Sequence, residues 1–274
     1  HPEEHGGLGL DWVTHLRLFE EVAYTSMDIA IPIVINIVGA DLLIQGASQH
    51  LRDKYLPGLM NGDLFISMGI SEPDVGSDVA AVSTKAVRDG DHWVINGEKT
   101  WISNGEYSDV FICTCKTGPG ELTHILIDRE EHGYEVRGIP KMALNGQSTA
   151  QIFLTDVRVP VENVIGEVGG GLKNTLVTFE RARCHMAAWG YSIGRRAMDE
   201  AIKYSQERTQ HGKPIAGHQL VAEKIAVMAT KIDAARLLAL RAADMIDKGI
   251  RCDKECEIQK LIVARALTGI QAFR

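Results

Sequence analysis

The sequence contains no long uninterrupted hydrophobic run and no concentration of basic residues. Its longest apolar stretch, from Ile29 to Val38, is much shorter than the roughly 20 residues that span a bilayer, and Pro32 and Asn36 interrupt it. We interpret this stretch as a buried helical segment. The formal net charge is −7, whereas a nucleic-acid surface needs clustered lysine and arginine. The sequence therefore argues against a membrane span and against nucleic-acid binding.

Cysteine is scarce and odd in number. The five residues are Cys113, Cys115, Cys184, Cys252 and Cys256. They form neither the even framework of a small secreted domain nor the two pairs of a structural zinc site, so we expect no metal. We expect a reducing compartment, either the bacterial cytoplasm or the mitochondrial matrix. The chain begins with His1 rather than Met and ends at Arg274 inside a helical pattern, so we expect that both ends are cut and that targeting cannot be read.

The periodicity of apolar residues changes twice along the 274 residues. Helical spacing dominates residues 1–63, short runs with a period of two dominate residues 64–168, and helical spacing returns in residues 169–274. In the last part, apolar residues recur every three or four positions from Val221 to Ala235, and Gly249 is a plausible helix stop. The pattern predicts an α+β fold with an N-terminal helical domain, a central antiparallel β domain and an incomplete C-terminal antiparallel helix bundle.

Two short motifs in the predicted β domain suggest a site for a flat ligand. The first runs from Ser71 to Asp78, where a Glu-Pro corner is followed by Gly76, at which the backbone can approach a ligand closely. The second runs from Lys99 to Gly105, where an aromatic and a hydroxyl residue two positions apart lie on one side of an extended segment. Together they indicate a flavin site, although each alone could be an ordinary turn or a packed strand.

The order of these motifs resembles the acyl-CoA dehydrogenase family. The resemblance also includes Pro2 to Gly9, Lys141 to Pro160, Arg183 and Glu207 to Gly212. It implies a helical domain, a central β domain and a four-helix bundle, with FAD between the last two and completed by a neighbouring subunit. This chain resembles the middle of that plan, without the first helices and without the end of the bundle.

The resemblance implies roles for several residues of the two motifs. Ser71, helped by the backbone near Ile70, would bond the flavin pyrimidine, and Ser77 would lie near the pyrophosphate and the acyl-CoA. Trp101 would cover the flavin ring, and Ser103 would bond its N5 region, where the hydride arrives. The alternative is structural, because the serines could cap turns and the tryptophan could be packing.

Four residues of the C-terminal region stand at positions that the family uses, and one of them departs from the family's residue. Arg208 would bond the FAD pyrophosphate of the partner subunit. His211 stands where the family commonly has Phe, so it keeps a flat ring but adds a titratable nitrogen. Glu180 and Arg183 correspond to an acyl-CoA-contacting tetrad. These charges could instead form an exposed helix face or helix end.

The reaction implied by the resemblance removes the α proton of an acyl-CoA with a carboxylate while the β hydrogen passes as hydride to the flavin. Electrons would then pass to an electron-transfer flavoprotein, and the assembly would be a homotetramer or homodimer. In most of the family the base lies in a loop beyond Arg274, and a minority branch places it where this chain has Ala182. We therefore name no base, and two alternatives stay open: an acyl-CoA oxidase or flavin monooxygenase, and a non-catalytic subunit.

Overall fold

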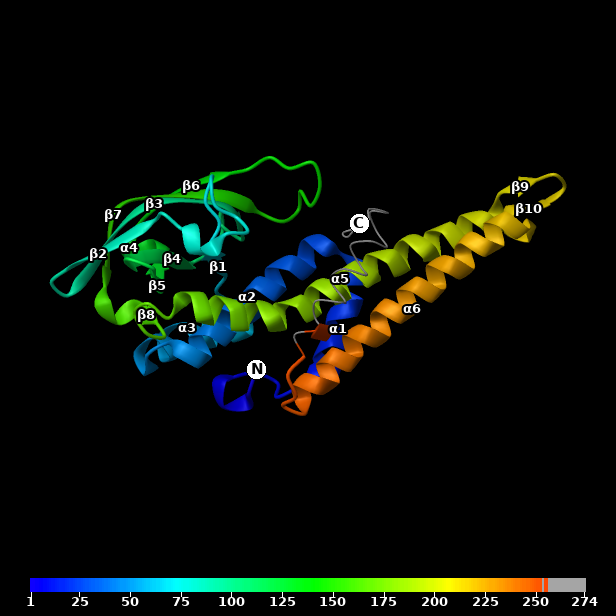
Figure 1. The fold of residues 1–274 in the computed structure, drawn as a ribbon. Coiled ribbons are helices and arrows are strands. Elements are labelled where there is room, and N and C mark those ends of the chain that lie inside the picture. Colours follow the sequence, from blue (N-terminus) through cyan, green and yellow to red (C-terminus); the bar gives the residue numbers. More distant parts are fainter. Residues whose placement is uncertain (253, 256–274) are drawn as a thin grey trace. The chain divides into compact units, whose positions relative to one another are not determined.

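The computed structural model describes residues 1–252, 254 and 255, apart from the side chain of Glu180. The chain forms two compact units, one made of residues 1–9 and 31–179 and the other of residues 10–30 and residue 180 onward. The helices are α1 (Trp12–Thr25), α2 (Met27–Gly46), α3 (Gln49–Asn61), α4 (Arg129–His132), α5 (Gly171–Glu207) and α6 (Gln219–Asp247) (Figure 1). The strands are β1 (Ile66–Gly69), β2 (Lys85–Asp89), β3 (His92–Ser103), β4 (Val110–Gly118), β5 (Glu121–Asp128), β6 (Glu135–Gly138), β7 (Thr149–Pro160), β8 (Val164–Ile165), β9 (Thr209–Gln210) and β10 (Lys213–Pro214).

The first unit is built on an eight-stranded sheet with the order β6-β7-β3-β2-β4-β5-β8, and β1 pairs with β4 off this path. Most neighbours are antiparallel, as the sequence predicts. Strand β1 is parallel to β4, and one residue pair between β2 and β4 is also parallel. The α+β prediction is thus confirmed. The chain that leaves β1 lies next to β3.

Two hydrophobic clusters cover the two faces of this sheet. On one face, side chains of α2 and α3 such as Leu43 and Leu56 pack with Ile112 of β4. On the other, Phe111 and Cys113 of the same strand pack with residues of β3, β5 and β7. Successive residues of β4 thus point to opposite faces, which is the period of two expected for a strand.

Helix α2 contains the apolar stretch that the sequence analysis interpreted as buried. By length and composition alone, it is the one helix among the described residues that could cross a membrane. Its polar Asn36, however, is used inside the protein: Nδ2 donates to Leu64 O at 3.0 Å, and Oδ1 accepts from Ile66 N–H at 3.0 Å. These two bonds fasten the start of β1 to α2, so this helix serves as part of the core.

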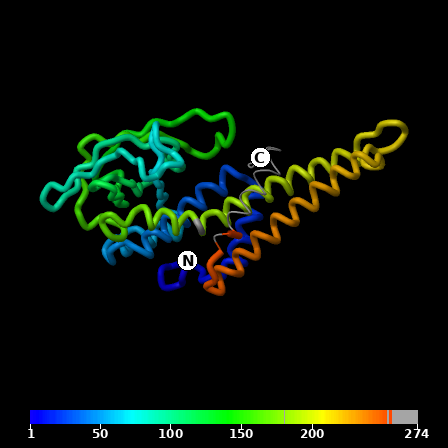
Figure 2. The backbone as a smooth tube through the Cα atoms, in the orientation of Figure 1, coloured from blue at the N-terminus to red at the C-terminus, as the bar shows by residue number. Residues whose placement is uncertain are grey.

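The second unit consists of α1, the larger part of α5, and α6. Helices α5 and α6 are joined by the β9–β10 hairpin, drawn in yellow in Figure 2. They approach closely where Gly194 faces Ile232, since a Cβ on that glycine would lie 3.4 Å from Cγ1 of the isoleucine. Helix α6 ends just before Gly249, whose φ of 66° is the left-handed conformation of a helix stop, as the sequence indicates. The predicted later part of the bundle lies outside the described residues.

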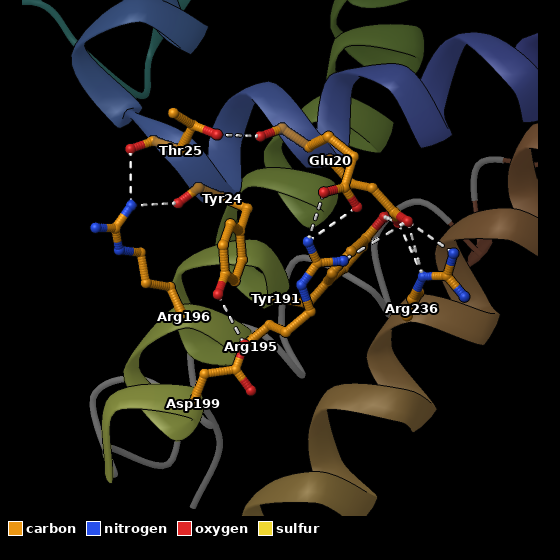
Figure 3. Close-up of polar contacts among 9 residues, drawn as sticks. Glu20, Tyr24, Thr25, Tyr191, Arg195, Arg196, Asp199 and Arg236 are labelled. Atoms are coloured by element: carbon orange, nitrogen blue, oxygen red, sulfur yellow. Dashed lines mark hydrogen bonds and ion pairs between the residues drawn. The ribbon is translucent and has the colours of Figure 1, made fainter. Parts of the chain in front are cut away.

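A buried carboxylate ties these three helices together (Figure 3). Glu20 of α1 accepts a hydrogen bond from the Tyr191 hydroxyl of α5 at 2.7 Å and forked bonds from Arg236 of α6 at 2.7 to 3.1 Å. Arg195 lies 4.0 Å from the same carboxylate. Burial alone would raise the pKa of Glu20, but the bonds from Arg236 and Tyr191 outweigh it and lower this pKa below its usual value.

Removing the charge of Glu20 is expected to loosen this unit. Glu20→Gln keeps the shape but cannot accept all the bonds from Arg236, so we expect a loss of about 2 kcal/mol in the free energy of unfolding. The measurement is urea unfolding, with the exposed neighbour Glu21→Gln as control. Because the pKa of Glu20 is lowered, its contribution is present above the unfolded-state pKa and is lost as the pH falls through the folded-state value. Equal effects of the two substitutions would contradict the role given to Glu20.

Candidate flavin site

The two predicted motifs meet at the end of β1. The chain leaves β1 at Gly69, and Thr100 N–H of β3 then donates a hydrogen bond to Ser71 O at 3.0 Å. This bond sets the start of the first motif directly beside the centre of the second. Ile70 is buried and Ser71 is half-buried at this junction. The structure therefore brings together Ile70, Ser71 and Trp101, which the sequence analysis placed at one flavin.

The first motif is a tight loop closed by its own backbone. Glu72 N–H donates to Val75 O at 2.8 Å, and Val75 N–H donates back to Glu72 O at 3.1 Å. Gly76 follows this turn. The space beside it is empty, because a Cβ added there would have no other atom within 4 Å. Ser77 follows and is exposed. The loop thus exposes Gly76 and Ser77, while the backbone bonds between Glu72 and Val75 hold its turn in place.

Beneath the loop lies a buried ion pair, Glu72–Lys99, that was not predicted from the sequence. The Glu72 carboxylate accepts bonds from Lys99 Nζ at 2.8 Å, from Ser83 N–H at 2.8 Å, from Ser83 Oγ at 2.6 Å and from Thr84 N–H at 2.9 Å. The side chain of Glu72 is 3% exposed and that of Lys99 is 0% exposed. Burial would raise the pKa of Glu72, but the bonds from Lys99, Ser83 and Thr84 lower it to about 2, so the carboxylate is ionised near neutral pH.

Trp101 has an unusual backbone and an exposed ring. Its φ is 61°, in the left-handed region that bulky residues rarely adopt, and its exposed fraction is 62%. The pairing of β3 with β7 shifts register between Lys99 and Ile102, so Trp101 sits in an irregularity of the strand. The expectation of an extended segment is therefore wrong at Trp101 itself, and that Trp101 and Ser103 lie on one side of it stays a prediction. An irregularity that turns a large aromatic side chain outward is typical of a binding site.

The end of β3 is fixed by Asn104, which is fully buried. Its Nδ2 donates to Ile66 O of β1 at 3.1 Å, and its Oδ1 accepts from the Tyr107 hydroxyl at 2.8 Å. Ser103 precedes it and pairs with Thr149 of β7 while remaining half-buried. Ser103, whose hydroxyl is predicted to reach the flavin N5 region, therefore lies between two residues that are held in place, Ile102 by its pairing with Ala150 and Asn104 by its side-chain bonds.

Arg208 and His211 lie together in the second unit, at the β9–β10 hairpin. Both are exposed. Arg208 N–H donates to Tyr204 O at 2.9 Å, which extends the hydrogen-bond pattern of α5 by one residue. Arg208 O accepts from Ile215 N–H at 2.8 Å, beyond the hairpin. His211 has a φ of 50° at the tip of the hairpin. The backbone at Arg208 is thus held from both sides, and its side chain is offered to the surroundings.

The residues matched to the acyl-CoA tetrad lie on α5. Arg183 is half-buried, next to the fully buried Cys184 and His185. Ala182, the position at which a minority branch of the family carries its base, is half-buried in the same turn. The side chain of Glu180 lies outside the described residues.

The donor set of the first unit fits FAD. An isoalloxazine ring is flat and carries a polar pyrimidine edge, and it needs an aromatic or apolar cover together with a few fixed donors. The exposed Trp101 supplies the aromatic cover, and the half-buried residues Ser71 and Ser103, whose backbone is held in place, carry the hydroxyl donors. The open position at Gly76 leaves room for a ligand to approach the backbone.

Comparison with known proteins covers nearly the whole chain. Residues 1–63, 67–157 and 169–271 match, in turn, the N-terminal, middle and C-terminal domains described for acyl-CoA dehydrogenases. The chain is 38% identical to glutaryl-CoA dehydrogenase of Desulfococcus multivorans over 90% of its own length and 66% of that protein. It is 36% identical to cyclohexane-1-carbonyl-CoA dehydrogenase of Syntrophus aciditrophicus over 98% of its own length and 72% of that protein. The chain thus spans about two thirds to three quarters of these relatives.

Solved structures agree with this result. A glutaryl-coenzyme A dehydrogenase in complex with glutaryl-CoA superimposes with a TM-score of 0.93 and 34% identity, covering 97% of this chain and 70% of that one. A glutaryl-CoA dehydrogenase of Mycobacterium smegmatis in complex with FADH2 superimposes with a TM-score of 0.90 and 26% identity, over 96% and 68% of the two chains.

Proposed function

Because the chain belongs to the acyl-CoA dehydrogenase family of FAD-dependent oxidoreductases, we propose that the whole protein dehydrogenates an acyl-CoA thioester between its α and β carbons. The observation that carries this proposal is the junction at Ser71, where a backbone bond to Thr100 sets Ser71 beside the exposed Trp101, next to the buried Glu72–Lys99 ion pair. Such a platform is suited to a flat cofactor that must be held without freedom to tilt.

The residues of this platform have separate tasks in the proposal. Ile70 and Ser71 hold the polar pyrimidine edge, Trp101 covers one face of the ring and excludes water, and Ser103 donates a hydrogen bond near N5. FAD, when bound, accepts the β hydrogen as hydride. The α proton requires a carboxylate base, which we place in the part of the protein beyond Arg274.

Partners and assembly are further parts of the proposal. Ser77 would lie near the pyrophosphate and the acyl-CoA, and Glu180 and Arg183 would contact the acyl-CoA. Exposure of Arg208 at the hairpin supports its reaching the FAD of a partner subunit in a homodimer or homotetramer. An electron-transfer flavoprotein would reoxidise the cofactor. The thiols of Cys113 and Cys115, which form no disulfide, fit a reducing compartment, the bacterial cytoplasm or the mitochondrial matrix.

The test is anaerobic titration of the full-length protein, loaded with FAD, with a panel of acyl-CoA thioesters. We expect at least one thioester to bleach the visible absorbance of the flavin, and an electron-transfer flavoprotein to restore it. Bound FAD that no thioester bleaches would contradict the proposal and favour a non-catalytic subunit. Rapid recovery of the absorbance with oxygen alone would favour an oxidase or monooxygenase.

Trp101→Ala should separate cofactor binding from stability. Since the ring is 62% exposed, we expect the free energy of unfolding to change by no more than about 0.5 kcal/mol. Loss of the aromatic cover should raise the dissociation constant for FAD by about tenfold. Val87→Ala is a matched control, because Val87 lies on β2 of the same sheet and is also 62% exposed. Equal FAD affinity in the two variants would remove Trp101 from the site.

A further inference from the structure

We propose that Lys99 is a positioning residue of the flavin site, which sets the direction and the donor strength of the Ser71 N–H without touching the cofactor. This inference rests on the proposed function, in which Ile70 and Ser71 hold the pyrimidine edge. In this inference the buried ion pair Lys99–Glu72 orients a hydrogen-bond donor of the site as well as stabilising the fold.

The first step is the path that the Lys99 side chain takes. Its aliphatic stem passes Gly69, the last residue of β1. A Cβ on Gly69 would lie 2.3 Å from Cζ of the fully buried Phe111 and 3.1 Å from Cγ of Lys99. Real Cβ atoms do not approach another atom as closely as 2.3 Å, so Phe111 leaves room only for glycine here, and a Cβ would also crowd the lysine stem. The end of β1 therefore lies tightly against both side chains.

The second step is the pair of groups that the ammonium binds. Lys99 Nζ donates to Ile70 O at 3.2 Å and to Glu72 Oε1 at 2.8 Å, so it holds the residues on both sides of Ser71. The carbonyl of Ile70 and the N–H of Ser71 belong to one trans peptide unit and point in opposite directions. With this carbonyl turned toward the buried ammonium, the Ser71 N–H points away from it.

The next peptide unit is held as well, because Ser71 O accepts from Thr100 N–H at 3.0 Å. The backbone on both sides of Ser71 is thus fixed. Its N–H cannot rotate toward the core without breaking the bond between Lys99 and Ile70. Lys99 therefore preorganises the donor that the proposed function assigns to the pyrimidine edge.

The third step is electrostatic. A cation that binds a carbonyl oxygen polarises the whole peptide unit, which makes the N–H at its other end a stronger donor, and a buried setting increases the effect. A stronger donor stabilises a ring that gains negative charge on reduction. Glu72 balances the charge of Lys99, so the site keeps this polarisation without an unpaired buried cation.

The test uses the full-length holoenzyme and the double substitution Glu72→Gln with Lys99→Met, which removes both buried charges at once. We expect the dissociation constant for FAD to rise by about ten- to a hundredfold and the reduction potential of bound FAD to become more negative. The matched control is Glu135→Gln with Arg137→Met, which removes an ion pair of the same β domain whose side chains are both 67% exposed. The control should leave both quantities unchanged.

A folded double variant with unchanged FAD affinity and potential would overturn the inference while leaving the proposed function intact. Failure of the wild-type protein to bind FAD would instead count against the proposed function. Should the double variant not fold, Glu72→Gln with Lys99→Gln decides, since two neutral amides can still bond each other and no unpaired charge is buried. We expect it too to bind FAD more weakly and at a more negative potential, and unchanged values would overturn the inference.

Discussion

Replacing Lys99 alone with methionine is expected to lower the free energy of unfolding by about 3 kcal/mol. The substitution leaves the Glu72 carboxylate buried without its counter-ion, and breaking a buried pair by removing one partner is among the most costly single changes. Bonds from Ser83 and Thr84 remain and offset part of the cost. The double substitution with Glu72→Gln should recover much of the loss, because no unpaired charge is then left.

Urea unfolding at several pH values measures this effect. In wild type the pKa of Glu72 is lowered to about 2, so its contribution is present above the unfolded-state pKa and is lost as the pH falls toward 2. Without Lys99 the carboxyl group protonates more readily, and the difference between variant and wild type should therefore shrink in acid. Lys85→Met, an exposed lysine on β2, is the control. A pH-independent difference would show that lost packing, rather than the unpaired charge, dominates.

The second large effect expected is a loss of stability between pH 6.5 and pH 4 caused by His124. This residue of β5 is fully buried, with Nδ1 3.0 Å from Thr114 Oγ1 and Nε2 3.1 Å from Thr175 Oγ1. The Thr175 hydroxyl donates its single proton to Gly171 O at 2.9 Å, so Nε2 must be the donor to Thr175 and Nδ1 is left to accept from Thr114. The neutral ring thus satisfies both of its nitrogens.

Burial lowers the pKa of His124 from 6.5 to about 4. Between these values the unfolded chain binds a proton that the folded chain does not, so stability falls as the pH falls through this window, by about 3 kcal/mol in total. Thermal unfolding from pH 7 to pH 4 should show this slope in wild type and a flatter one in His124→Gln. His50→Gln, at an exposed site on α3, should keep the wild-type slope. An unchanged slope in His124→Gln would contradict the assignment.

The sequence was sufficient to predict the three-part architecture because each part has its own apolar period. The stripe from Val221 to Ala235 and the stop at Gly249 agree with α6 and its end. The parallel pairing of β1 with β4 was not predictable in this way, because the period of a strand says which residues share a face but not which strand lies beside it.

For the candidate site, the sequence predicted the two motifs but not the buried ion pair that supports them. Charged residues are almost never fully buried unless paired, and the pairing of Glu72 with Lys99, 27 residues apart, gives no local signal in the sequence. One available hint was that the first motif carries an acid at its second position, whereas the second motif begins with a lysine. The left-handed backbone of Trp101 was also hidden, because it arises from a register shift against β7 rather than from the residues around it.

The ion pair beneath the loop also limits how this sequence can change over evolutionary time. A lineage that replaces Lys99 or Glu72 alone passes through a protein with a buried, unmatched charge, whereas replacing both removes the charges together. The glycine at position 69 adds to the constraint, because a Cβ there would lie 2.3 Å from Cζ of Phe111 and 3.1 Å from Cγ of Lys99. The three positions are therefore expected to change together rather than one at a time.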